Sequence, residues 1–180
     1  RPSDLDPAIR SPLDADDNYR FARGNIVHYL LEVLPQLPAD KQENACRKYL
    51  VEPAHELKAP QQDELAKEIF KVLRHTEFAP IFGPNSRAEV PIVGLISKHD
   101  AQEYYAISGQ IDRMLVEKDR VLVVDYKTNR PPPTDPKDVP NVYRKQLLAY
   151  KTALCEIYPD KKIECALLWT DGPNLMPIDV

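Results

Sequence analysis

A carboxylate and an ammonium group follow directly on an aliphatic segment of the chain. Residues 121–124 read Val-Leu-Val-Val, a run typical of a buried strand, and Asp125, Tyr126 and Lys127 come next. Side chains two residues apart on a strand point to the same face, so we expect Asp125 and Lys127 to emerge side by side. Such a pair is either a surface ion pair at a strand end or part of a site for a divalent cation and an activated water.

A second carboxylate comes from the segment just upstream. Residues 108–113 read Ser-Gly-Gln-Ile-Asp-Arg, and they lie within residues 104–117, which are predicted to form the antiparallel neighbour of the strand that ends at Asp125. The turn between the two strands is expected at residues 118–120. This pairing would bring Asp112 close to Asp125. Two carboxylates and an ammonium group at one strand end are unsuited to a core but suited to binding a cation.

Further polar residues accompany these strands in a characteristic order. An early helix begins Arg-Gly at residues 23–24 and reaches His28, whereas Gln146 and Tyr150 are four residues apart on a later helix and so share a face. The whole set resembles the RecB-like branch of the restriction-endonuclease-like, or PD-(D/E)XK, nuclease superfamily. The sequence Asp-Tyr-Lys-Thr-Asn-Arg at residues 125–130, followed by three prolines, is most similar to the C-terminal nuclease domain of AddA-type bacterial helicase–nuclease subunits. The resemblance extends from about residue 23 to about residue 169.

The resemblance implies a metal site. In it, Asp112 and Asp125 would hold Mg²⁺ or a substituting Mn²⁺, and His28 would be a further ligand. The backbone carbonyl of Tyr126 would also bind the metal, while its side chain packs on the opposite face. Neutral imidazole suits Mn²⁺ better than Mg²⁺, so His28 could tune the choice of metal. By its helical setting alone, His28 could equally be a hydrogen-bonded core residue.

The remaining catalytic residues are also implied by the resemblance. Lys127 would orient or deprotonate the attacking water, and Gln146 and Tyr150 would contact the DNA backbone or support the lysine. Without the family, Gln146 and Tyr150 read as part of an ordinary amphipathic helix. Glu89, on the first predicted strand of the core, is either a solvated strand residue or an auxiliary acid of the site.

The chain is acidic, with a net charge of −4, whereas free-standing DNA-binding proteins tend to be basic. Positive charge is concentrated in residues 127–151, which contain six basic residues against two acidic ones. From this segment we predict DNA contacts by Arg130, Arg144 and Lys145, although a solvated helix face is the alternative. A modest basic patch on an acidic domain fits an enzyme whose DNA is delivered by a motor.

Hydrophobic periodicity predicts an α/β fold. Three helices are expected first, then three strands, a proline-rich loop, an amphipathic helix, and a further strand. The implied architecture is a restriction-endonuclease-like core, with a mixed sheet flanked by helices and an N-terminal helical layer. Residues 1–14 are predicted to be a linker or domain edge and residues 15–180 one nuclease domain, mainly helical over 15–80 and catalytic over 87–180. The expected elements are helices 16–34, 41–50, 61–74 and 141–158 and strands 87–93, 104–117, 121–124 and 163–169.

The three cysteines, Cys46, Cys155 and Cys165, fit neither a disulfide framework nor a metal-binding motif. This favours a reducing bacterial cytoplasm and argues against the four-cysteine iron–sulfur cluster of some related nucleases. The longest apolar runs are too short for a membrane span. The start at Arg1 suggests a segment of a longer protein.

These features predict a metal-dependent DNA nuclease domain of a bacterial helicase–nuclease. The complete enzyme would process double-strand DNA ends for recombinational repair, cutting the single strands that unwinding produces. Its partners would be DNA, helicase domains of the same chain and a second helicase–nuclease subunit, and ATP would bind only to the helicase part. Two alternatives remain: an inactive nuclease-fold module for DNA binding or scaffolding, and a stand-alone RecB-like or CRISPR-associated exonuclease.

Overall fold

The structure is a computed structural model that describes residues 15–97 and 104–180, so the predicted linker at residues 1–14 lies outside the described part. A five-stranded mixed sheet forms its centre, with the strands in sequence order across the sheet. Neighbouring strands are antiparallel except for the third and fourth, which are parallel. The strands are β1 (Ser86–Ser97), β2 (Tyr104–Val116), β3 (Arg120–Lys127), β4 (Lys162–Trp169) and β5 (Asn174–Pro177).

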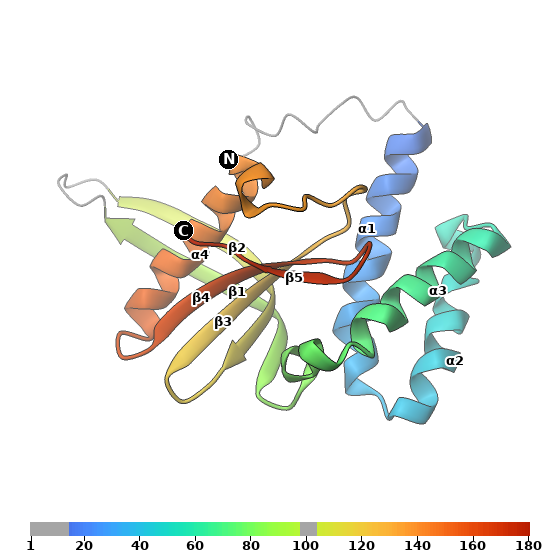
Figure 1. The fold of residues 1–180 in the computed structure, drawn as a ribbon, viewed down its shortest axis with the longest axis horizontal. Helices are drawn as coiled ribbons and strands as arrows, with labels where there is room; N and C mark the ends of the chain where they lie inside the picture. Colours follow the sequence, from blue (N-terminus) through green and yellow to red (C-terminus); the bar gives the residue numbers. More distant parts are fainter. Residues whose placement is uncertain (1–14, 98–103) are drawn as a thin grey trace.

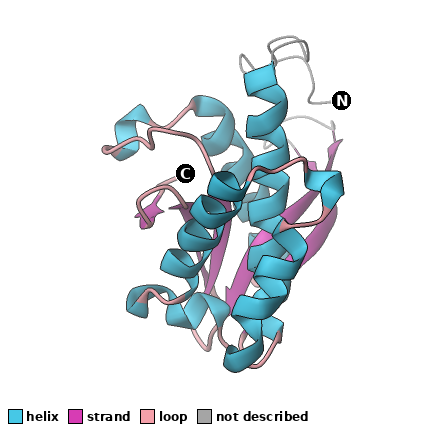
Figure 2. Ribbon diagram, turned by 90° about the vertical axis from the view of Figure 1, so that its right-hand side faces the viewer, coloured by secondary structure: helices cyan, strands magenta, loops and turns pink. Residues whose placement is uncertain are grey.

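Helices cover the sheet, as predicted, and the sheet lies between two hydrophobic clusters. Figure 1 shows the first three helices grouped at one side of the sheet and the fourth at the other, and Figure 2 shows helices and strands as distinct layers. Parallel strands need such a crossover helix between them, and the fourth helix supplies it for β3 and β4. The helices are α1 (Ala15–Val33), α2 (Ala39–Leu50), α3 (Ala59–Leu73) and α4 (Asn141–Ile157). Short 3₁₀ segments lie at Leu34–Gln36, Pro53–His55, Thr76–Phe82 and Pro136–Asp138.

Alternate residues of β3 enter different clusters, as the strand period requires. Val124 and Tyr126 pack with the buried residues of α1, α2 and α3, whereas Val123 packs with Leu147 of α4. The aliphatic run that suggested a buried strand is therefore buried on both faces. No helix in the described ranges 15–97 and 104–180 is long and apolar enough to cross a bilayer.

The first strand is longer than the sequence pattern indicated. The prediction ended at Val93, but β1 continues to Ser97 and pairs with β2 throughout that extension. Gly94 interrupts the alternation there, and Val93 and Leu95 are 78% and 72% exposed, so burial does not produce a recognisable pattern. Backbone pairing with β2, rather than side-chain burial, defines this part of the strand.

The sheet forks where β2 and β3 separate. Their last ladder pair joins Arg113 to Val124, after which β2 continues beside β1 and β3 continues beside β4. Asp112 and Asp125 are the next residues on each strand, and thus flank the fork. The Tyr126 amide, which has left the β2 ladder, instead donates to Asp112 Oδ2 at 2.6 Å. The fork therefore presents both predicted acids at one place.

Candidate active site

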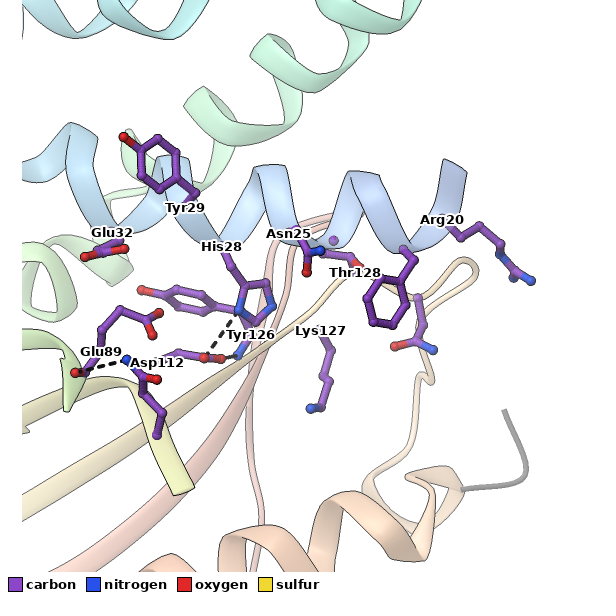
Figure 3. Close-up of a pocket in the computed structure, with 14 residues that line it drawn as sticks. Arg20, Asn25, His28, Tyr29, Glu32, Glu89, Asp112, Tyr126, Lys127 and Thr128 are labelled. Atoms are coloured by element: carbon purple, nitrogen blue, oxygen red, sulfur yellow. Dashed lines mark hydrogen bonds and ion pairs between the residues drawn. The ribbon is translucent and has the colours of Figure 1, made fainter. Parts of the chain in front are cut away.

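The Arg-Gly-x-x-x-His sequence of α1 docks that helix against the end of β3. Arg23 is buried and donates from Nη1 to the carbonyl of Thr128 at 2.7 Å. A Cβ at Gly24 would lie 3.4 Å from Thr128 Oγ1, at ordinary van der Waals distance, so α1 passes close to the end of β3 at this point. His28 lies one turn further along and faces the fork in the sheet (Figure 3).

Three side chains from three different elements meet above the fork. Ligand atoms of His28, Glu89 and Asp112 all lie within 4.8 Å of one another. His28 Nδ1 is 3.3 Å from Asp112 Oδ1, and its ring packs edge-on against Tyr126 with 5.5 Å between centroids. Burial alone would lower the pKa of His28, but contact with Asp112 and the charge of Asp125 outweigh it and raise that pKa. One imidazole and two carboxylates form a donor set that suits Mn²⁺ and Mg²⁺.

Glu89 enters this cluster through an unusual backbone conformation. Its φ is +49°, and it lies opposite Asp112 in the register, between the ladder pairs Ala88–Arg113 and Val90–Ile111. The left-handed region is disfavoured for a non-glycine residue and is a form of strain found at functional sites. Burial and the charges of Asp112 and Glu32 raise the pKa of Glu89. This position is consistent with the predicted auxiliary acid, and the role itself stays a prediction.

Asp125 and Lys127 do emerge together, and they form a buried ion pair. Lys127 Nζ lies 2.5 Å from Asp125 Oδ2, and Asp125 is 3% exposed. Burial raises the pKa of Asp125 although Lys127 opposes the shift, and the Asp112 carboxylate adds to it. Burial would lower the pKa of Lys127, but the Asp125 charge raises it, so the ammonium form is favoured. This burial excludes the surface ion pair that the sequence also allowed. Metal binding by Asp125 stays a prediction, because in this structure the Asp125 carboxylate pairs with Lys127.

Tyr126 points away from its two neighbours, as predicted. Its ring is 1% exposed and belongs to the cluster beneath α1, where Arg113 Nε donates to the hydroxyl at 3.1 Å. Burial raises the pKa of Tyr126 to about 12. These side-chain contacts do not test metal binding by the backbone carbonyl of Tyr126, which stays a prediction.

Gln146 and Tyr150 form a hydrogen-bonded line between Lys127 and β2. Lys127 Nζ lies 3.4 Å from Gln146 Oε1, Gln146 Nε2 donates to the Tyr150 hydroxyl at 3.1 Å, and that hydroxyl donates to the carbonyl of Gln110 at 2.9 Å. A Cβ at Gly109 would come within 2.8 Å of the Tyr150 ring. Gly109 is therefore needed for Tyr150 to reach β2, and the pair is placed to support the lysine.

A buried polar network beside the site could not be anticipated from the sequence. Glu68 of α3 accepts hydrogen bonds from Arg23, Arg130 and Thr170. The Thr170 amide in turn donates to the carbonyl of Lys127 at 3.0 Å. The only available signal was an acid within the otherwise apolar face of a predicted helix, next to Ile69. The network joins α1, α3 and the loop after β3.

The residues predicted to contact DNA are mostly engaged within the protein. Arg130 has a carboxylate near each guanidinium nitrogen, from Glu64, Glu68 and Asp171, which favours a structural role over a DNA contact. Arg144 donates to the backbone carbonyls of residues 136 and 179. Lys145 is exposed on α4. Residues 127–151 therefore offer fewer unpaired positive side chains for DNA than their composition suggested.

One open cavity of about 580 Å³ gathers most of these groups. His28, Asp112 and Lys127 line it together, and Figure 3 shows them converging from α1, β2 and β3. Asp125 and Gln146 contact Lys127, and Tyr150 contacts Gln146, but none of these three residues lines the cavity. The rest of the wall is formed by Arg20, Phe21, Gly24, Asn25, Tyr29, Glu32, Glu89, Gln110, Tyr126, Thr128 and Asn129.

Known proteins with similar sequences include bacterial helicase/nuclease subunits. A segment of 94 residues is 30% identical to an ATP-dependent helicase/nuclease subunit of Streptococcus thermophilus, covering 52% of this chain and 8% of that protein. Proteins of the same name match over more of the chain in Streptococcus equi subsp. zooepidemicus (27% identity, 84% of this chain, 12% of the relative) and Streptococcus pyogenes (26%, 86% and 13%). The chain thus spans only about a tenth of these relatives' length.

A match to a protein-family model agrees with the fold. The model of the PD-(D/E)XK nuclease superfamily matches residues 7–174, nearly the entire sequence. The match includes the forked sheet, the acids at the fork and the lysine beside them. The chain belongs to the PD-(D/E)XK nuclease superfamily and is a nuclease domain similar to those of AddA helicase/nuclease subunits.

Proposed function

We propose that this domain is a metal-dependent deoxyribonuclease that hydrolyses phosphodiester bonds of single-stranded DNA. The observation that carries the proposal is the meeting of His28, Glu89 and Asp112 in the cavity that also contains Lys127. Three ligand side chains from separate elements are arranged within 4.8 Å, and the strained backbone of Glu89 is tolerated there. An ammonium group beside such a cluster is suited to phosphate chemistry.

His28, Glu89 and Asp112 are the residues that would hold the metal, with Asp125 and the Tyr126 carbonyl beside them. A bound Mg²⁺ or Mn²⁺ would polarise the phosphate and lower the pKa of a water molecule. Burial raises the pKa values of Glu89 and Asp125, and the Asp112 carboxylate raises both further, so a bound cation would relieve repulsion among these acids. His28 binds a metal only when its ring is neutral.

Lys127 acts on the substrate side of the site. Its ammonium group is held by Asp125 at 2.5 Å and lies near Gln146, so it is preorganised and not free to rotate. Placed against the scissile phosphate, it orients the attacking water and offsets the negative charge that develops in the transition state. Gln146 and Tyr150 keep the lysine in this position.

The biological setting that we propose follows the names of the relatives. As part of a helicase–nuclease, the domain would cut the strands released by unwinding of double-strand DNA ends, in preparation for recombinational repair. Helicase domains of the same chain would use ATP and deliver DNA, and a second helicase–nuclease subunit would complete the enzyme. The net charge of −4 supports delivery by a motor, because an acidic domain has no overall electrostatic attraction for the phosphate backbone.

The test is cleavage of an end-labelled single-stranded oligonucleotide with Mg²⁺, with Mn²⁺ and with a chelator. We expect metal-dependent cleavage that Asp112→Asn abolishes while the thermal melt of the protein stays cooperative. Glu64→Gln is the matched control, because Glu64 is an exposed acid outside the cavity. Cleavage that resists the chelator, or that survives Asp112→Asn unchanged, would remove the proposed site. Failure of the parent domain to cut any strand, while still binding Mn²⁺, would instead favour an inactive DNA-binding module.

A further inference from the structure

One face of α1 carries an exposed aromatic side chain into the active-site cavity. Phe21, Asn25, His28 and Glu32 recur at intervals of four, three and four residues, so they form a single stripe along the helix. All four line the cavity. Phe21 is 76% exposed, although a phenylalanine side chain is ordinarily buried. Among the other apolar residues of α1, Ile26, Val27, Leu30 and Leu31 are no more than 3% exposed, whereas Tyr29, which also lines the cavity, is 43% exposed.

The stripe is chemically different on the two sides of His28. Towards the C-terminal end of α1 lies Glu32, whose charge is close enough to raise the pKa of Glu89. Glu32, which is not one of the three cluster residues, adds a negative charge on that side of the cluster, and this charge repels a phosphate backbone. Towards the N-terminal end lie the neutral side chains of Asn25 and Phe21 and the basic side chain of Arg20, and Thr128 and Asn129 also line the cavity. We therefore expect a DNA strand that is bound at the metal cluster to run from the cluster towards Phe21.

From this arrangement we propose that Phe21 is a stacking platform for an unpaired base of the substrate strand, and that it gives the site its preference for single-stranded DNA. The inference rests on the proposed nuclease function and adds its substrate-recognition element. Aromatic side chains bind single strands without regard to sequence, because every base offers a π-face. In a duplex those faces are covered by neighbouring bases, so Phe21 has nothing to stack on.

The position of the stacked base follows from helix geometry. Phe21 and His28 are seven residues apart, which is about 10 Å along the axis at 1.5 Å per residue. Successive nucleotides of a stacked strand are about 3.4 Å apart, so the base on Phe21 lies roughly three nucleotides from the scissile phosphate, and fewer if the strand is extended. The nearer nucleotides pass Asn25, which can donate to and accept from phosphate or base edges.

Three variants separate stacking from simple hydrophobic contact. Phe21→Ala removes the ring, Phe21→Leu keeps an apolar side chain without a π-face, and Phe21→Tyr restores an aromatic ring. Val51→Ala is the matched control, because Val51 is 57% exposed on the far helix layer and does not line the cavity. Since Phe21 is so exposed, all four variants should melt like the parent.

The experiment measures half-saturating concentration and cleavage rate for labelled single strands in Mg²⁺, including strands with one abasic position stepped along the sequence. We expect Phe21→Ala and Phe21→Leu to raise the half-saturating concentration by roughly 5- to 100-fold, with Phe21→Tyr near the parent. An abasic position about two to three nucleotides from the cut should raise the half-saturating concentration of the parent by the same factor. It should not raise that of Phe21→Ala any further. Equal half-saturation for the parent and Phe21→Ala would overturn the proposal and assign the exposed ring to a protein contact.

A binding measurement keeps this test independent of catalysis. With Mn²⁺ present and Lys127→Ala as a slowly cleaving background, a strand carrying fluorescent 2-aminopurine at the same position should be quenched when residue 21 is Phe or Tyr, but not in the double variant with Phe21→Ala. Quenching in this background without cleavage by the parent in Mg²⁺ would support the platform and contradict the nuclease function. Cleavage by the parent with unchanged fluorescence in this background would support the nuclease and contradict the platform.

Discussion

Arg23 of α1 and Glu68 of α3 form a buried ion pair in which Arg23 Nη2 lies 2.6 and 2.5 Å from the two carboxylate oxygens of Glu68. Both side chains are 5% exposed. Through Arg23 the pair reaches the Thr128 carbonyl, and through Thr170 it reaches the carbonyl of Lys127. It therefore fixes the helix that carries His28 relative to the strand that carries Lys127.

Loss of Glu68 should destabilise the fold strongly. Glu68→Ala leaves Arg23 without its carboxylate in a buried site, and removing one partner of such a pair typically costs about 3–5 kcal/mol. Urea denaturation of the parent and variant measures this difference. Glu64→Gln is the control, since Glu64 is a half-exposed partner of Arg130 and such pairs contribute about 0–1 kcal/mol. Equal losses in the two variants would show that burial of the Arg23 pair is not the cause.

A double substitution should reveal the contact between Gly109 and Tyr150. Gly109→Ala places a Cβ 2.8 Å from the Tyr150 ring, so the ring must move and its bond to Gln110 weakens. We expect lower stability and slower cleavage for Gly109→Ala, and a smaller effect of the same change in a Tyr150→Ala background. Melting temperatures and single-turnover rates of the four proteins form the cycle. Strictly additive effects would mean that the clash has no functional consequence.

Metal affinity should depend on the protonation of His28. Its pKa is raised above 6.5, chiefly by Asp112, so the protonated ring and the carboxylate stabilise the metal-free fold at low pH. That contribution is complete below the unfolded-state pKa and is lost as pH rises through the higher folded-state pKa. Mn²⁺ requires the neutral ring, so its affinity should rise over the same interval. Calorimetric titrations at several pH values should show this rise in the parent and a flatter profile in His28→Ala.

Removal of the Glu89 charge should have opposite effects on the fold and on the metal. The pKa of Glu89 is raised by burial and by Asp112 and Glu32, so the stability of the metal-free protein falls as pH increases from the unfolded-state value towards the folded-state one. Glu89→Gln should raise the melting temperature at neutral pH and reduce the further increase on adding Mg²⁺. If Mg²⁺ raises the melting temperature of the variant as much as that of the parent, Glu89 is not a ligand.

The sequence predicted most of the fold because its elements have regular periodicity. The four helices and the strands β2, β3 and β4 lie within two residues of their expected bounds at nearly every end, since burial on one or both faces produces the pattern. Backbone hydrogen bonds alone define the extension of β1, and an exposed Leu95 beside Gly94 gives no periodic signal. The positive φ of Glu89, which lies opposite Asp112 between two β1–β2 ladder pairs, is likewise encoded by no local pattern.

The site was less predictable from sequence wherever long-range pairing decides a side chain's role. Asp125 and Lys127 were expected together because they share a strand face, and the structure places them 2.5 Å apart. Arg130 looked like a DNA contact in a basic segment, but the acids that surround it come from α3 and from the turn after β4, far away in the chain. Composition counts charges and cannot show which of them are already paired.

The most direct measurement of the central claim combines metal binding with cleavage in Lys127→Ala. Lys127 lies beside the His28, Glu89 and Asp112 cluster without belonging to it, so the variant should bind Mn²⁺ with an affinity within a few-fold of the parent. Single-turnover cleavage of a labelled single strand should nevertheless slow by roughly 100-fold or more, the range ascribed to a positioned proton-transfer or charge-stabilising group. Cleavage by Lys127→Ala at the parental rate would contradict the assignment of this cavity as the nuclease site.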